Sequence, residues 1–285
     1  MSRIAYVNGR YLPLSDAAVS IEDRGYQFAD GVYEVCEVRG GLLVDERRHL
    51  ARLDRSLREI GMARPMSAAA LSVVLHETVR RNRVHDGIVY LQITRGVARR
   101  DFAFPPADTP PSVVVSARGN DRARIEQLAA DGIAVITVPD IRWQRVDIKS
   151  VALLPNVLAK QTAREQGARE AWLVDAQGRV TEGASSNAWI VSRDGKLITH
   201  PLGHDVLPGI TRAVVLDVVK AQGLELEERA FTVQEAYAAR EAFVTSASQI
   251  VLPVVSIDGR PIGNGAPGLI ATALRRDYHR HAELS

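Results

Sequence analysis

Cysteine is nearly absent from this 285-residue sequence, which contains only Cys36. A single cysteine excludes an intrachain disulfide framework and fits a reducing compartment, and we expect its side chain to be a small buried hydrophobic group. A lone cysteine cannot build a thiolate site, and the seven histidines include no H-E-x-x-H pair, so we expect no metal.

Long apolar runs and a strong charge imbalance are also missing. No apolar run approaches the roughly 20 residues that span a bilayer, and residues 1–4 begin no signal peptide, so we expect a cytoplasmic protein without membrane contact. The 36 basic and 34 acidic residues give a net charge of +2 with no dense Lys/Arg run, which argues against nucleic-acid binding. With 46% hydrophobic and 25% charged residues, the chain suits an ordinary globular protein of one large or two smaller domains.

Lysine is scarce, because only four of the 36 basic residues are lysines. A lysine that attacks a carbonyl must be uncharged, so its pKa must fall by about 3 units from ~10.4, at a cost of roughly 4 kcal/mol, in a site shielded from water or rich in cations. Lys160, Lys196 and Lys220 lie among polar residues. Lys149 is flanked by β-branched residues and followed by an apolar segment, so we expect it to be the buried, reactive amine.

Apolar spacing predicts a mixture of short strands and amphipathic helices. The expected strands are 4–7, 10–12, 32–38, 88–94, 112–116, 133–138, 171–174, 188–191 and 242–246. The expected helices are 46–62, one capped by Ser67, 122–130, 155–166, 210–221 and 268–281. This mixture favours an α+β fold over a doubly wound sheet. The pattern breaks at 119–121, so we expect domains at 1–119 and 120–285, with the long connection 95–111 as a candidate functional loop.

Two familiar motifs are excluded by their context. Residues 263–268 fit G-x-G-x-x-G, but only 17 residues follow, too few for the rest of a dinucleotide-binding unit. Residues 183–187 are not a nucleophile elbow, because asparagine stands where G-x-S-x-G needs its second glycine.

Several segments resemble the fold-type-IV pyridoxal-phosphate enzymes. These segments are 142–150, 159–161, 180–187, 209–212 and 243–246, and they follow one another in the same order as in that family. The string at 22–35, EDRGYQFADGVYEV, resembles D-amino-acid transaminases in particular. The resemblance implies a two-domain α+β fold, with the cofactor in a cleft between a smaller N-terminal domain and a larger C-terminal pseudo-barrel domain. It also implies that the C-terminal domain carries the Schiff-base lysine and most of the cofactor site.

The resemblance assigns cofactor roles to individual residues. Lys149 is expected to hold pyridoxal 5'-phosphate as a Schiff base, the internal aldimine, and to move the proton at the substrate Cα. Glu182 is expected to face the pyridine nitrogen and keep it protonated. The helix start at 209–211 would offer backbone N–H groups to the phosphate. The other expected cofactor ligands are Arg52, Leu207, Ile210, Thr211, Ser246 and Ala247, the last where the family often has threonine.

Substrate recognition is where the sequence departs from the family. The resemblance places Tyr33 and Val35 in the substrate pocket, and the family binds the α-carboxylate with a tyrosine and an Arg-x-His pair. Here Arg100 keeps the arginine, but Phe102 stands where the histidine would be. The missing charge-assisted donor removes about 1.5–3 kcal/mol of binding if nothing replaces it.

The resemblance therefore implies a ping-pong transamination from a D-amino acid to a 2-oxo acid such as 2-oxoglutarate or pyruvate, in a homodimer. Because Phe102 suits a neutral substituent, the first alternative is an (R)-selective amine transaminase. Branched-chain L-aminotransferase and aminodeoxychorismate lyase are weaker alternatives within the fold. A non-catalytic binding protein is disfavoured, because Lys149, Glu182, Arg52 and Tyr33 are all present.

Overall fold

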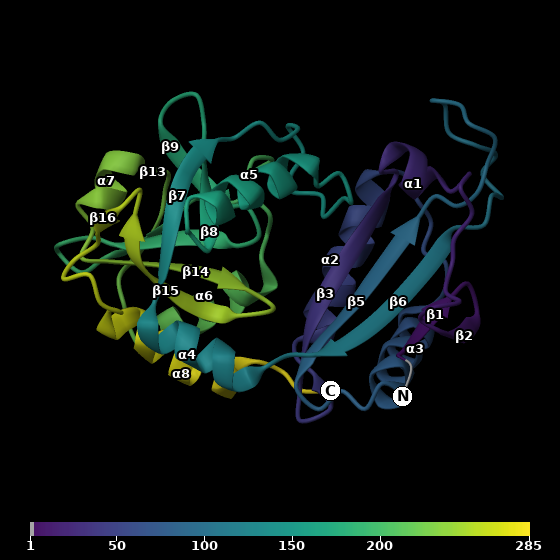
Figure 1. The fold of residues 1–285 in the computed structure, drawn as a ribbon, viewed down its shortest axis with the longest axis horizontal. Helices are drawn as coiled ribbons and strands as arrows, with labels where there is room; N and C mark the ends of the chain where they lie inside the picture. The colour runs from purple at the N-terminus through teal and green to yellow at the C-terminus, as the bar shows by residue number, and fades with distance from the viewer. Residues whose placement is uncertain (1–2) are drawn as a thin grey trace. The chain divides into compact units, whose positions relative to one another are not determined.

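The structure is a computed structural model that describes residues 3–285, and its contacts divide the chain into two units (Figure 1). Unit 1 contains the chain up to Arg122, together with Ile148–Ala152 and Glu283–Ser285. Unit 2 contains Ala123–Asp147 and Leu153–Ala282. The first crossing lies three residues beyond the expected boundary at 119/120.

The segment that carries Lys149 packs in unit 1, although the sequence assigned it to the C-terminal domain. Backbone hydrogen bonds explain this placement. Tyr33 N donates to Lys149 O at 3.0 Å, and Val151 N donates to Gly31 O at 3.0 Å, so the segment runs beside the start of a unit 1 strand. Pairing between two segments that lie far apart in the sequence cannot be predicted from the composition of either segment. How the catalytic roles divide between the two domains stays a prediction.

Unit 1 is built on a six-stranded antiparallel sheet in the order β2-β1-β6-β5-β3-β4. Its strands are β1 (Ile4–Val7), β2 (Arg10–Pro13), β3 (Gly31–Arg39), β4 (Leu42–Leu43), β5 (Gly87–Thr94) and β6 (Ser112–Gly119). Its helices are α1 (Arg24–Phe28), α2 (Glu46–Glu59) and α3 (Ala68–Arg81). Helix α2 packs against β3, and α3 packs against β1, β5 and β6, so both cover one face of the sheet (Figure 1).

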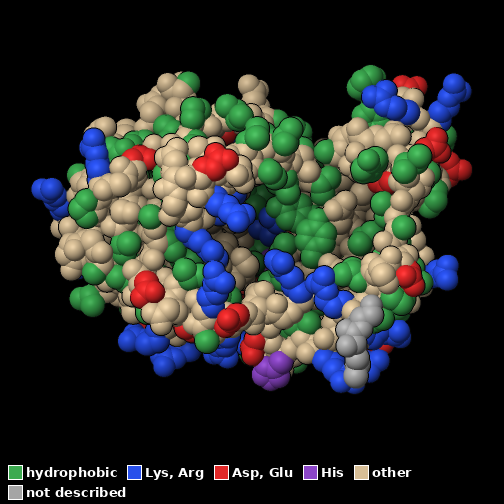
Figure 2. Space-filling model, viewed as in Figure 1, with side chains coloured by type: hydrophobic (Ala, Val, Ile, Leu, Met, Phe, Trp, Pro, Cys, Tyr) green, Lys and Arg blue, Asp and Glu red, His purple; other side chains and the backbone are tan. Residues whose placement is uncertain are grey.

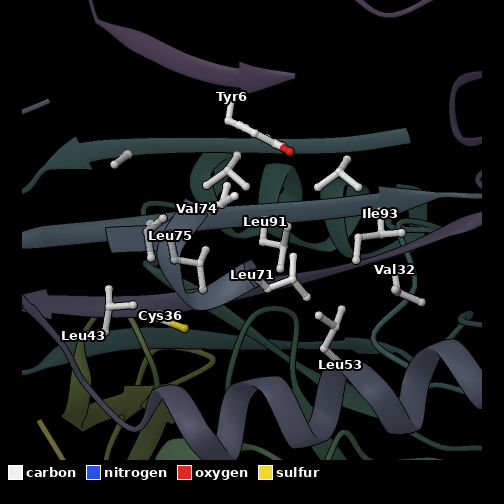
Figure 3. Close-up of a cluster of buried hydrophobic side chains, with 14 of the residues drawn as sticks. Tyr6, Val32, Cys36, Leu43, Leu53, Leu71, Val74, Leu75, Leu91 and Ile93 are labelled. Carbon is white, nitrogen blue, oxygen red and sulfur yellow. The ribbon is translucent and has the colours of Figure 1, made fainter. Parts of the chain in front are cut away.

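The core of unit 1 lies between this sheet and its two long helices. Figure 3 shows Leu53 of α2 reaching toward the strands near Val32 of β3, while Leu71 and Leu75 enter the same cluster from α3. Cys36 is free and buried, as expected. Burying side chains of this size contributes about 1.5–3 kcal/mol each. Helix α2 is therefore held by its apolar stripe, and its polar residues take the orientation which that stripe dictates.

Unit 2 is built on a ten-stranded mixed sheet that curls into a half-barrel, in the order β12-β11-β10-β14-β15-β7-β8-β9-β13, with β16 paired to β15. Its strands are β7 (Ile133–Pro139), β8 (Glu170–Val174), β9 (Arg179–Gly183), β10 (Asn187–Val191), β11 (Leu197–Thr199), β12 (Leu226–Glu228), β13 (Phe231–Thr232), β14 (Glu241–Ser246), β15 (Ile250–Ile257) and β16 (Arg260–Pro261). The helices are α4 (Arg122–Asp131), α5 (Leu154–Glu165), α6 (Ile210–Ala221), α7 (Val233–Tyr237) and α8 (Leu269–His281). The α+β class expected from the sequence is confirmed.

Aromatic side chains fill the interior of the unit 2 sheet. The rings of Trp189 and Phe243, on the neighbouring strands β10 and β14, stack with centroids 5.4 Å apart. Trp172 and Phe231 meet edge to face at 5.9 Å. All four are fully buried, and aromatic pairs of this geometry add about 0.5–1.5 kcal/mol beyond burial. These strands therefore form a rigid support for the turns at their ends.

The surface of unit 2 carries charges in pairs. Figure 2 shows Lys and Arg side chains gathered over α8, whose sequence contains three arginines. Arg276 and Arg280 pair with Asp277, and Arg275 pairs with Glu126. This basic face is thus largely neutralised by its own acids. Across residues 3–285, no helix combines the length and apolar character that a membrane crossing requires.

Candidate active site

In unit 1, Lys149 lies beside Tyr33. Its Nζ is 4.2 Å from the centroid of the Tyr33 ring, and its backbone N donates to Ser56 Oγ at 3.3 Å. The side chain is half-buried, whereas the sequence predicted a buried amine. The ring forms one apolar wall beside the amine.

The exposed face of β3 and β5 completes this half of the site. Side chains alternate along a strand, so Tyr33 and Val35 point to the face away from α2. Tyr90 and Gln92 lie opposite them on β5, with the Tyr33 and Tyr90 rings 5.7 Å apart. Tyr90 Oη donates to Gln92 Oε1 at 2.6 Å, and burial raises the pKa of Tyr90 to about 12. Sequence reasoning missed Tyr90 and Gln92, although the alternation of β5 places them on this face.

Behind this face, Arg52 is a buried ion-pair partner of Glu34. Its Nε and Nη2 donate to the two Glu34 oxygens at 2.8 and 2.7 Å, and His49 Nδ1 lies 2.7 Å from Glu34 Oε2. Burial alone would raise the pKa of Glu34, but Arg52 and His49 together lower it to about 2. Burial lowers the pKa of His49, against the pull of Glu34. The sequence signal for Glu34 was an acid between Val32 and Cys36 on the apolar face of a strand.

The loop 95–111 carries Arg100 and Phe102. The Arg100 guanidinium lies 5.1 Å from the Phe28 ring and 5.6 Å from the Phe102 ring, and Phe102 is 80% exposed. Arg24 Nη1 donates to the Asp101 carbonyl at 2.6 Å, which ties the loop to α1. Within residues 3–285, neither Arg100 nor Phe102 has a hydrogen bond, ion pair or ring contact with the residues around Lys149.

In unit 2, Glu182 on β9 is a caged carboxylate. Its Oε2 accepts from Asn187 Nδ2 at 2.9 Å and from Leu207 N at 3.2 Å, while Oε1 accepts from Arg142 Nη1. Burial alone would lower the pKa of Arg142, but Asp140 and Glu182 raise it above its usual value. The structure thus joins Glu182 and Leu207, both expected in the site, directly and through Asn187. The sequence assigned no role to Asn187 or Arg142.

Helix α6 begins beside this carboxylate. Gly209 is its N-cap residue, and no side chain caps this end. A Cβ on Gly209 would lie 2.0 Å from Asn187 Oδ1, so only glycine fits there. Thr211 is buried in the first turn and Ile210 is half-buried. Ser246 is the last residue of β14, and Ala247 begins the turn that follows. Helix α6 packs against β14.

Comparisons with known proteins identify the family. The family described as amino-transferase class IV matches residues 31–257. The chain is 46% identical over 261 residues to a D-alanine aminotransferase of Bacillus licheniformis, covering 92% of this chain and 90% of the relative. It is 39% identical over 279 residues to a D-alanine aminotransferase of Staphylococcus aureus, covering 98% and 97%.

Solved structures show the same fold. A branched-chain amino acid aminotransferase of T.th., solved with pyridoxamine 5'-phosphate, has a TM-score of 0.89 at 27% identity and covers 98% of this chain and 94% of its own. The branched-chain amino acid aminotransferase of Escherichia coli has a TM-score of 0.88 at 23% identity, with the same coverage. The match over residues 31–257 and the near-full-length relatives lead to one conclusion: the chain belongs to the class IV aminotransferase family.

Proposed function

We propose that this protein transfers the amino group of a D-amino acid, D-alanine above all, to a 2-oxo acid with pyridoxal 5'-phosphate as cofactor. The observation that carries the proposal is Glu182, a buried carboxylate paired with Arg142 and fixed by Asn187. Such a group suits a protonated ring nitrogen. The D-alanine aminotransferases that share 46% and 39% of its residues support the choice of substrate.

The described residues fit this cofactor. The uncapped start of α6 presents backbone N–H groups and the positive end of a 12-residue helix, which favour a phosphate. Lys149 offers a half-buried amine, and Glu182 offers a fixed acceptor. When bound, pyridoxal phosphate supplies an aldehyde that links to amines and a ring that withdraws electrons from the substrate Cα.

The side chains then have distinct tasks. Lys149 takes the proton from the substrate Cα and returns it to the product carbon. Glu182 would face the ring nitrogen and favour its protonated form, in the orientation that Arg142 and Asn187 set. Arg52, Leu207, Ile210, Thr211, Ser246 and Ala247 remain the proposed cofactor ligands. Tyr33 and Val35 bound the substrate from the β3 face.

We also propose that the protein acts as a cytoplasmic homodimer. The long loop and α1 of unit 1 expose a group of large apolar side chains, which needs cover in solution. Its members are Ile21, Tyr26, Val97, Phe102 and Phe104. Because Arg100 lies in this group and not beside Lys149, a second copy that covers the patch would receive Arg100 as a carboxylate ligand. The lone buried Cys36 fits a reducing compartment.

The test is turnover of D-alanine with 2-oxoglutarate, read as pyruvate formed, with L-alanine as the control. We expect a yellow protein that uses the D-enantiomer. Lys149→Ala should lose both the visible absorbance and at least about 1000-fold in kcat, because the covalent amine is gone. A colourless wild type that ignores added cofactor would refute the proposal.

A second candidate is an (R)-selective amine transaminase, favoured by exposed Phe102 beside Arg100. Turnover of (R)-1-phenylethylamine, measured beside D-alanine, separates the two. Near-exclusive use of the amine would replace the first proposal with the second.

A further inference from the structure

Asp140, Arg142 and Glu182 form a continuous chain of ion pairs inside unit 2. Arg142 Nε and Nη2 donate to the two Asp140 oxygens at 2.9 and 2.7 Å, and Nη1 donates to Glu182 Oε1. The side chains are 13%, 5% and 6% exposed, in the order Asp140, Arg142, Glu182. Arg142 therefore stands between two carboxylates and connects them electrostatically.

Asp140, at one end of this ion-pair network, is held rigidly. Asp140 follows β7, and its backbone N donates to Val174 O at 2.8 Å. Its carboxylate also accepts from Arg142 N at 3.1 Å and from Thr181 Oγ1 at 2.8 Å. Thr181 directly precedes Glu182 on β9, so the two carboxylates are tied to the same strand. A two-point Arg–carboxylate pair fixes the guanidinium plane, which a lysine could not do.

Glu182, at the other end of the network, is equally constrained. Asn187 Nδ2 donates both to Glu182 Oε2 and to Leu207 O, at 2.9 and 3.0 Å. With Arg142 on one oxygen and Asn187 and Leu207 N on the other, the carboxylate plane cannot turn freely. The direction in which Glu182 faces a ligand is thus set by its partners.

The network of Asp140, Arg142 and Glu182 contains more carboxylates than guanidinium groups. Together the three side chains carry two carboxylates and one guanidinium in a largely buried place. Burial raises the pKa of Asp140, but Arg142 and Thr181 outweigh burial and lower it, so Asp140 stays ionised. A ligand that brings a positive charge against Glu182 would suit this cluster.

We propose that Asp140 and Arg142 are positioning residues that act through Glu182 to set how firmly the cofactor ring nitrogen holds its proton. The inference rests on the proposed function. Arg142 makes Glu182 a weak base, so the proton stays on the ring nitrogen and does not move to the carboxylate. Asp140 offsets the charge of Arg142, so the site stays negative enough to favour the protonated ring.

Replacing Asp140 and replacing Arg142 should change the basicity of Glu182 in opposite directions, and this makes the inference testable. Asp140→Asn exposes Glu182 to the uncompensated charge of Arg142, so the ring nitrogen should lose its proton at lower pH. Arg142→Met should make Glu182 the stronger base, so the proton should leave the ring nitrogen for the carboxylate even at neutral pH. Arg142→Lys keeps the charge and should keep the ring protonated.

The measurement is the ¹⁵N chemical shift of the ring nitrogen in protein loaded with ¹⁵N-labelled pyridoxal phosphate, followed against pH. We expect Asp140→Asn to lower the titration midpoint by about one pH unit or more. The matched control is Asp175→Asn, which removes another unit 2 carboxylate that binds an arginine through Nε, at 2.7 Å, and caps a turn. It should leave the midpoint unchanged.

The outcomes separate this inference from the proposed function. If Asp140→Asn matches Asp175→Asn, or if Arg142→Met and Arg142→Lys give the same shift, the two residues only support the fold and the inference is overturned. Should Asp140→Asn not fold, the Met and Lys pair still decides. A wild type that binds cofactor but does not transaminate D-alanine refutes the proposed function alone, because the shifts remain measurable.

Discussion

At the scale of single residues, buried carboxylates of this protein form ion pairs with arginines. Glu34 and Glu182 are both buried carboxylates, one in each unit, and each is paired with a guanidinium. Removing a carboxylate from such a pair leaves a buried cation, which costs more than the pair itself contributes. The consequence is clearest for Glu34, where Arg52 and His49 share one acceptor.

Glu34→Gln should lower the free energy of unfolding by about 3 kcal/mol at neutral pH. The pKa of Glu34 is depressed from 4.5 to about 2, so its contribution is complete above pH 4.5 and is lost as pH falls toward 2. Urea denaturation followed by circular dichroism should show that the variant lacks this part of the acid dependence. Glu77→Gln, which loses a carboxylate shared by Arg80 and Arg81 at the surface, should change little. Equal effects of the two variants would contradict the assignment.

At the scale of elements, long periodic segments could be predicted and short ones could not. The helix expected at 210–221 is α6, and the strands expected at 4–7 and 10–12 are β1 and β2, which pair across the turn at Asn8-Gly9. Helix α2 ends at Glu59, three residues earlier than expected, because Gly61 takes a left-handed conformation. Strands β4, β9, β11, β12 and β13 and helices α1 and α7 were missed, because two to five residues show no period.

The candidate site shows the same limit. Motif resemblance identified the segments around Lys149, Glu182 and Gly209, but not the partners that hold them. Asp140 lies 42 residues from Glu182, and their connection through Arg142 exists only after β7, β8 and β9 align. Contacts between distant segments depend on strand register, which a single sequence does not state.

Gly209→Ala tests whether α6 must approach Asn187 closely. The added Cβ would displace Asn187 and loosen Glu182, so we expect about tenfold weaker cofactor binding, equivalent to an overpacking cost at the lower end of 1–3 kcal/mol. Fluorescence titration of the apoprotein with pyridoxal phosphate measures it. Gly119→Ala, where the nearest atom to a new Cβ is 3.6 Å away, is the control. Wild-type affinity in Gly209→Ala would mean that the close approach does not matter for the cofactor.

At the scale of the whole molecule, the chain crosses between its units more than once. Residues Glu283–Ser285 belong to unit 1, while α8 before them belongs to unit 2. The tail pairs with residues 43–45: Leu43 N donates to Ser285 O at 2.9 Å, and Asp45 N donates to Glu283 O at 2.8 Å. Ser285 Oγ donates to Glu46 Oε2 at 2.7 Å. The last residues thus extend the edge of the unit 1 sheet.

Deleting residues 283–285 should expose this edge. We expect a loss of about 2 kcal/mol from the missing backbone hydrogen bonds, and faster amide exchange at Leu43 and Asp45. Hydrogen exchange by mass spectrometry measures both residues. Glu283→Ala keeps the backbone bonds and removes only an exposed ion pair with Arg47, so it should resemble wild type. Unchanged amide exchange at Leu43 and Asp45 in the deletion variant would show that residues 283–285 do not stabilise this edge.

The return of Ile148–Ala152 to unit 1 bears on how the gene can be divided. A split after codon 122 yields a first fragment with Tyr33 and Arg52 but without the amine, and a second fragment in which the stretch bearing the amine has lost the strand it docks on. Neither fragment alone could be assayed for reaction of the amine with the aldehyde of the cofactor. Complementation by co-expressed fragments would have to rebuild that strand contact before any colour returned.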